Sequence, residues 1–225
     1  MEYERRMHAV QQDLRQTIVE KACALFIERG IVNVKMTDVA ERSGVGVASL
    51  YRWFGTKKEL AMQAGILIWQ RVGMYLDGVF TSPVYLDKCG LDRCGDLLKL
   101  FYAAFMGHPE YLRFLRDFDN FVEAEHITPE ELRKYEKSIL DLQTPARAAY
   151  EAGLADGSIR PVDFNTFYYT STHALMALAQ KLVCAGSLIS SDSLVGGEQQ
   201  LLALIDMMLT YLKPVPTQAI GGGNT

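Results

Sequence analysis

The sequence lacks a long apolar run. A membrane-spanning helix needs about 20 predominantly apolar residues, and even the stretch 174–183 is interrupted by Gln180 and Lys181. The first six residues, Met1-Glu-Tyr-Glu-Arg-Arg, also lack the apolar core of a secretory signal. These absences predict a cytoplasmic protein that has no membrane partner.

Cysteine is scarce, and the four cysteines form no CxxC pair. Four thiols in 225 residues are too few for a disulfide framework, so we expect them to be reduced and expect no metal site. Cys23 and Cys184 fall within apolar helical patterns and are predicted core residues. Cys89 and Cys94 flank a glycine-containing helix start, where a redox role is the alternative.

Signatures of catalysis are absent as well. The chain contains no HExxH motif, nucleophile elbow, P-loop or dinucleotide fingerprint. The strongest candidates for catalytic residues lie in Glu123-Ala-Glu125-His126 and His108-Pro-Glu110. Glu123 and Glu125 are two positions apart, however, and side chains with this spacing on a helix do not share a face. We therefore predict no catalytic residue, no cofactor and no enzymatic activity, with a small-molecule hydrolase as an unfavoured alternative.

No segment alternates as a β-strand does, whereas helical periodicity recurs along most of the chain. This pattern predicts an all-α fold. We expect three N-terminal helices within residues 1–55, with residues 1–8 flexible, a larger helical domain over 56–213 and a disordered tail over 214–225. The longer helices are expected over roughly 56–79, 92–106, 109–125, 129–151, 162–184 and 194–212.

Residues 36–54 have the pattern of two short helices joined by a glycine turn. Gly30 stops the amphipathic helix that precedes them, and Gly44 is suited to the left-handed conformation that ends a helix. Thr56 can cap the following helix, with Glu59 at the capping-box position. This layout is typical of a helix-turn-helix that reads the DNA major groove.

Residues 46–49 supply what close approach to DNA requires. Gly46 leaves the helix N-terminus open to a phosphate, and Val47 and Ala48 are short enough to meet thymine methyl groups. Ser49 is a short hydrogen-bonding side chain.

Residues 1–60 carry ten Lys and Arg against eight Asp and Glu, a net charge of +2, whereas the remainder carries −6. Contact with nucleic acid is therefore expected through the N-terminal part alone.

Longer polar residues follow on the same helix. Tyr51 can reach a phosphate, and Arg52 can contact guanine or phosphate. Trp53 is included in the predicted DNA-binding set, although packing on the first helix is its alternative. Between the two lysines after this helix, Lys57 is the predicted phosphate contact, and Lys58 is expected to be solvated.

Residues 9–60 resemble the DNA-binding domain of the TetR family of transcriptional regulators. The resemblance rests on Asp38-Val39-Ala40, Ser43-Gly44-Val45, Leu50-Tyr51, Phe54 and Lys57-x-Glu59-Leu60, and Gly153-xxx-Gly157-Ser-Ile-Arg-Pro161 resembles a later feature of that family. It implies a repressor that binds double-stranded DNA at a palindromic operator as a homodimer. Lys35 and Gly46 depart from the usual capping residues. Lys35 and Thr37 are nevertheless included as expected DNA contacts.

The last two helices are apolar on more than one face, so they need partners on both sides. A four-helix bundle formed by two copies of the chain would cover them and set the spacing of the two DNA-binding domains. The predicted dimer-interface residues are Leu175, Leu182, Leu201, Ile205 and Met208.

Aromatic residues in the larger domain suggest a cavity for a small apolar or aromatic effector. A plain core would give the same pattern. The candidate ligand-binding residues are Phe101, Tyr102, Phe105, Phe114, Phe118, Tyr169, His173 and Met176. A third possibility is a helical scaffold with a vestigial DNA-binding domain, which salt-dependent binding to a specific palindrome would exclude.

Overall fold

The computed structural model describes residues 2–186 and 188–215, and these residues form helices and turns without any β-strand. The all-α fold is thus confirmed. The helices are α1 Glu2–Arg29, α2 Met36–Ser43, α3 Val47–Phe54, α4 Lys57–Phe80, α5 Pro83–Leu86, α6 Gly90–Gly107, α7 Pro109–Ala124, α8 Pro129–Leu140, α9 Gln143–Asp156, α10 Phe164–Gln180 and α11 Gly197–Leu212. No helix in this described part is long and apolar enough to cross a bilayer.

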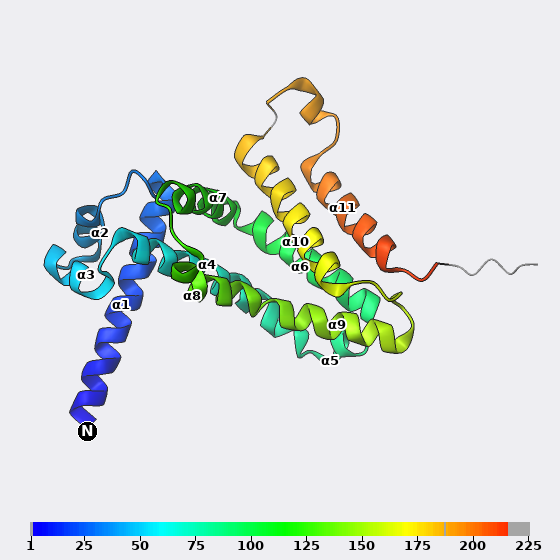
Figure 1. Ribbon diagram of the computed structural model, residues 1–225, viewed down its shortest axis with the longest axis horizontal. Helices are drawn as coiled ribbons and strands as arrows, with labels where there is room; N and C mark the ends of the chain where they lie inside the picture. The colour runs from blue at the N-terminus through cyan, green and yellow to red at the C-terminus, as the bar shows by residue number, and fades with distance from the viewer. Residues whose placement is uncertain (1, 187, 216–225) are drawn as a thin grey trace, which may run out of the picture.

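Helices α1 to α3 form a small N-terminal domain at one end of the molecule, with α10 and α11 toward the other end (Figure 1). Its core consists of side chains that are almost completely buried, including Ile18, Phe26, Val39 and Leu50. These residues face one another because each helix repeats its apolar positions every three or four residues. The N-terminal turns of α1 extend away from this core, and residues 4–13 are exposed.

Glycine ends α1 and α2 as expected. Gly30 has φ +80°, and its amide donates to the carbonyl of Phe26. Gly44 has φ +69° and ψ +28°, and the amide of Val45 then reaches back to the carbonyl of Ala40. This left-handed conformation favours glycine because a Cβ atom would crowd the backbone.

Two expected boundaries differ from the structure. Residues 2–8, expected to be flexible, belong to α1. The expected helix over 129–151 is two helices, α8 and α9, separated at Asp141 and Leu142. Pro145 explains this break, because proline has no amide to donate to the carbonyl of Asp141 and its ring crowds that carbonyl. Most of the expected tail, residues 216–225, lies outside the described residues.

The ends of the last two helices differ as well. Helix α10 passes into a π-helical turn over Lys181–Ala185, and a short 3-10 helix, Ser190–Ser193, precedes α11. Helix α11 begins at Gly197 rather than at Leu194, which is exposed.

The larger domain is held together by a close contact between α6 and α9. A Cβ atom added to Gly90 would lie 2.0 Å from the amide nitrogen of Gly153 and 2.6 Å from the carbonyl oxygen of Ala149. Only glycine permits this approach of the two backbones. The turn after α9 then caps α6, because Asp156 accepts a hydrogen bond from the amide of Gly90 at 2.8 Å.

Most of the residues predicted for the dimer interface pack in the chain's own core, whereas Met208, which also lines a groove on α10 and α11, and half-buried Leu182 stay predicted contacts. Leu175, Leu201, Ile205 and Met208 are at most 8% exposed, and half-buried Leu182 packs against the same cluster. Both helices are apolar around much of their surface, so the sequence did not distinguish the inward face from the outward one. The side chains that remain on the other side are described below.

Two cysteine expectations also change. Cys94, considered for a redox role, is buried, and burial raises the pKa of its thiol to about 12. Cys184, expected in the core, is only half-buried. Cys23 is buried as expected, and burial raises its pKa to about 11. The two buried thiols therefore have little thiolate character at neutral pH.

Candidate DNA-binding surface and ligand cavity

Helix α3 divides its side chains between the core and solvent. Leu50 and Phe54 are buried, whereas Tyr51 is 49% exposed and Val47 is 38% exposed. Ala48 and Arg52 are exposed beside them. The exposed side of α3, formed by Val47, Ala48, Tyr51 and Arg52, is called the reading face below. Among the described residues, neither the Tyr51 hydroxyl nor the Arg52 guanidinium has a hydrogen-bond partner.

The N-terminus of α3 lies next to the reading face. Gly46 is its N-cap, with φ −68° and ψ 140°, and no side chain among the described residues caps the helix. The first amides of α3 are therefore available to an anion, as at other phosphate-binding helix ends. Ser49 is half-buried and follows in the first turn.

Helix α2 contributes a second exposed N-terminus. Lys35 is its N-cap residue, and the amide of Lys35 donates to Asp38 Oδ2 at 2.8 Å. The side chains of Lys35 and Thr37 are both exposed at this end. Asp38, at the third position of the helix, thus supplies one half of a capping box, and a Thr at position 35 would supply the other half by accepting from an amide of the first turn.

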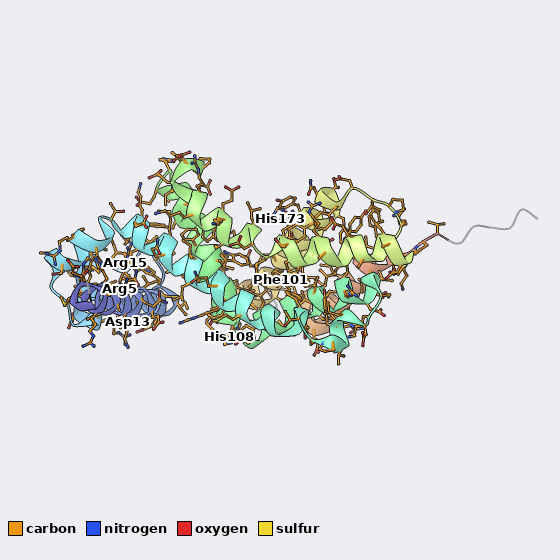
Figure 2. The ribbon with its side chains drawn as sticks, turned by 90° about the horizontal axis from the view of Figure 1, so that it is seen from below. Arg5, Asp13, Arg15, Phe101, His108 and His173 are labelled. Atoms are coloured by element: carbon orange, nitrogen blue, oxygen red, sulfur yellow. The ribbon has the colours of Figure 1, made fainter. Side chains whose placement is uncertain are left out.

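Contacts with α1 hold the reading face in place. The guanidinium of Arg15, labelled in Figure 2, lies 5.1 Å from the centre of the Phe54 ring. Arg42 on α2 pairs with Glu28 on α1 at 2.7 Å. The three helices of the N-terminal domain are therefore fixed relative to one another by polar contacts as well as by the core.

Lys57 is not placed to contact a phosphate. Its ammonium group donates hydrogen bonds to the carbonyl oxygens of Ile31, Val32 and Val34, at 3.0, 3.2 and 3.1 Å. It also lies 5.5 Å from the centre of the Phe121 ring on α7. Burial lowers the pKa of Lys57, and Glu125 partly offsets this effect. The prediction for Lys57 is corrected because its donors are already used within the chain.

Two neighbouring expectations change for related reasons. Lys58, expected to be solvated, donates to the carbonyl of Glu125 at 2.8 Å and pairs with its carboxylate at 3.4 Å. Trp53 is half-buried and packs against the core, which is the alternative considered for it. The remaining candidates, Lys35, Thr37, Gly46, Val47, Ala48, Ser49, Tyr51 and Arg52, stay predicted DNA contacts.

A second candidate site is a cavity of about 250 Å³ within the larger domain. It is called the aromatic cavity below. Phe101, Tyr169, His173 and Met176, all predicted from the sequence, belong to its lining. Figure 2 shows Phe101 and His173, from α6 and α10, near each other in the middle of the molecule. Tyr169 and His173 remain exposed, so the cavity is open to solvent.

The other four predicted ligand residues do not line this cavity. Phe105, Phe114 and Phe118 are at most 3% exposed and pack in the core. Tyr102 lies by Glu198 on α11, where burial and a hydrogen bond with Glu198 raise its pKa. Helical spacing identified these residues as inward-facing but did not distinguish a packed interior from a cavity wall.

The sequence did not identify several lining residues. Trp69 of α4 and Tyr135 of α8 meet in the wall, where the indole Nε1 donates to the Tyr135 hydroxyl at 3.0 Å. Asp119 of α7 also lines the cavity. The available signal was the position of Asp119, one turn after the buried Leu115 and next to the buried Phe118 on an amphipathic helix.

The residues considered for catalysis have other contacts. His108 bridges the Tyr75 hydroxyl, 2.6 Å from Nε2, and Glu110, 2.9 Å from Nδ1. Glu125 pairs with Lys58, and Glu123 is exposed on the last turn of α7. The acids at 123 and 125 therefore do not converge with His108 on one site.

Comparisons with known proteins agree with this geometry. Residues 18–64 match the sequence profile of bacterial regulatory proteins of the tetR family. No curated protein sequence matches the chain. The fold is shared with solved structures over most of its length.

Three of these structures show the extent of the likeness. A protein from Mesorhizobium loti assigned to the TetR family of transcriptional regulators is 16% identical, with a TM-score of 0.69 over 90% of this chain and 98% of that one. A TetR-family protein from Rhodococcus sp. is 22% identical, with a TM-score of 0.64 over 88% and 99%. A protein from Saccharomonospora viridis assigned as a transcriptional regulator, solved in complex with choline, is 19% identical, with a TM-score of 0.66 over 91% and 100%.

Proposed function

We propose that this chain, a member of the TetR family of bacterial regulatory proteins through its N-terminal domain, is a ligand-responsive repressor that binds a palindromic operator as a homodimer. The observation that carries the proposal is the reading face. It places two unpaired polar side chains, Tyr51 and Arg52, beside an uncapped helix N-terminus on a rigid three-helix domain. This is the combination that phosphate anchoring and base reading require. The protein would act in the cytoplasm, where the DNA is.

The outward side of α10 and α11 supports dimerisation. Thr166, Thr170, Leu204, Met207 and Tyr211 line a groove there, called the outer face below. Met207 is 66% exposed and Tyr211 is 51% exposed. Two copies that meet through this face would cover these side chains in a two-fold, self-complementary contact. The two reading faces would then lie at a fixed separation, as a palindrome needs.

Helix α4 gives the aromatic cavity a route to the DNA-binding domain. Its first turn holds the 31–34 loop through Lys57, and Trp69, twelve residues later, lines the cavity. A helix covers this span with about 18 Å of rigid backbone. An effector that favours one position of Trp69 can therefore shift the balance between two orientations of the domain. An effector with equal affinity for both orientations would have no effect. The choline complex of the Saccharomonospora viridis protein supports a small-molecule ligand for the present chain.

Selection of bound fragments from the source genome tests the proposal. The purified full-length chain is expected to enrich fragments that share one two-fold symmetric motif, with half-sites about one helical turn apart or a multiple of it. The affinity for that motif should fall steeply with salt, because each phosphate contact releases counterions. Enrichment of no common motif, or affinity that does not depend on sequence, would contradict the proposal and favour a scaffold.

A further inference from the structure

The aromatic cavity differs from an ordinary gap in the core in the charge of its wall. Five aromatic side chains line it, namely Trp69, Phe101, Tyr135, Tyr168 and Tyr169. Its lining also contains one carboxylate, that of Asp119, and no lysine or arginine is found among the described residues that form it.

Asp119 has no counter-ion in the described part of the chain. Its carboxylate makes neither a hydrogen bond nor an ion pair there, and burial alone raises its pKa. The side chain as a whole is exposed, so the carboxylate lies where the cavity opens to solvent and a ligand can reach it. A carboxylate that is partly desolvated and has no partner is stabilised when a cation binds beside it.

The neighbouring phenols do not share the negative charge. Burial raises the pKa of Tyr168 to about 12, and it raises that of Tyr135 further. Both hydroxyls therefore stay protonated at neutral pH. The bond from the Trp69 indole to the Tyr135 hydroxyl fixes these two rings in the wall. The cavity thus presents the electronegative faces of aromatic rings and one carboxylate to a ligand, together with the imidazole of His173 and the uncharged side chains of Thr172 and Gln180.

We propose that the aromatic cavity binds a small organic cation, a substituted ammonium with one positive charge. Aromatic faces attract such a cation within about 6 Å of the ring centre, most strongly when the group is desolvated. The Asp119 carboxylate supplies the opposite charge. A neutral ligand would bury Asp119 further without compensating it, and an anion would be repelled. A volume of about 250 Å³ suits a small cation. This inference rests on the proposed ligand response and names the class of the ligand.

The chain contains a built-in reporter for the test. It has two tryptophans, Trp53 in α3 and Trp69 in the cavity wall, so Trp53→Phe leaves Trp69 as the fluorophore. Phenyltrimethylammonium is the probe, and tert-butylbenzene is its uncharged isostere. Titration of the full-length W53F protein, followed by fluorescence and by calorimetry, should give saturable binding of the cation. The isostere should bind at least tenfold more weakly.

Asp119→Asn removes the charge while it keeps the shape of the side chain. In the W53F background it should weaken binding of the cation at least tenfold and leave binding of the isostere unchanged. Glu123→Gln is the matched control, because Glu123 is an exposed acid on the same helix outside the cavity lining, and it should change neither affinity. The melting temperature of D119N should equal or exceed that of the parent, since an uncompensated carboxylate is removed.

Four results would overturn the inference, and three of them come from the binding measurements. These are equal affinities for the cation and its isostere, a D119N variant that binds the cation as tightly as its parent, and the absence of any saturable binding by the folded protein. A D119N variant with a lower melting temperature would assign Asp119 a structural role and would also overturn it. None of these results would alter binding to the operator by the ligand-free protein, so failure here is distinguishable from failure of the proposed function.

Discussion

At the scale of single residues, Lys57 connects the DNA-binding domain to the larger domain. Its ammonium group reaches the 31–34 loop through three carbonyls, and it lies by Phe121 of α7. The sequence places Lys57 correctly in the first turn of a helix, but it gives no sign that carbonyls more than twenty residues earlier surround the side chain. This is why a lysine at this position was predicted to contact DNA.

Lys57→Ala tests the structural role. Loss of a charged donor that serves three carbonyls, two of them partly buried, should lower the free energy of unfolding by about 2 kcal/mol in the absence of DNA. Lys35→Ala is the control, because Lys35 is exposed and its side chain has no hydrogen bond among the described residues. Urea denaturation measures both variants. A K57A protein that is as stable as the wild type but binds DNA more weakly would contradict this structural role and would support the original prediction that Lys57 contacts a phosphate.

Asp156 makes stability depend on pH. Its pKa is lowered by hydrogen bonds from the Ser158 hydroxyl and from the amides of Gly90 and Ser158. A folded pKa below the unfolded value of 3.8 means that the stabilisation is present above pH 3.8 and is lost as the pH falls through the folded pKa.

Asp156→Asn should therefore melt at a lower temperature than the wild type at pH 7, and the difference should shrink below about pH 3.8. Asp13→Asn is the control, since the exposed Asp13 carboxylate has no hydrogen bond within the described residues. Thermal melts between pH 7 and pH 3 provide the measurement. A difference that stays constant over this range would show that the charge of Asp156 is not involved.

At the scale of helices, most elements follow from periodicity and capping residues. Thr56 accepts a hydrogen bond from the amide of Glu59 at the start of α4, as expected. Pro145 was the signal in the sequence for the break between α8 and α9. The apolar pattern continues through this position, so one long helix was predicted instead. Packing distances between helices were not predictable, because they depend on residues far apart in the chain.

The contact of α6 with α9 provides a test at this scale. Gly90→Ala places a methyl group against the backbone of Gly153, so it should push the helices apart and destabilise the protein by about 3 kcal/mol. Gly107→Ala, at the other end of α6, meets no atom within 4 Å and should be close to neutral. Chemical denaturation compares the two. Equal stability of G90A and the wild type would show that α6 and α9 are further apart.

At the scale of the whole molecule, the sequence predicted that the last two helices need partners, but it did not separate the face that packs in the chain's own core from the face that stays outside. Leu201 and Ile205 pack inside the chain, and Met207 and Tyr211 remain outside. An apolar pattern around a whole helix carries no information on which side meets the same chain and which meets a second copy.

Met207→Glu tests the outer face as a dimer contact. A charge there should shift sedimentation from dimer to monomer, because the carboxylate would be desolvated in the contact. Met74→Glu is the matched control, since Met74 is also 66% exposed but lies on α4. It should leave the dimer intact. A monomeric wild type, or an M207E protein that remains dimeric, would exclude this interface.

The central claim is that the reading face recognises DNA, and a fluorescence-anisotropy titration of the selected operator tests it most directly. Arg52→Ala should weaken specific binding by about 1 to 3 kcal/mol without loss of the fold. Arg113→Ala, an exposed arginine on α7, should bind as the wild type does. Equal affinities of R52A, R113A and the wild type for the operator would contradict the account.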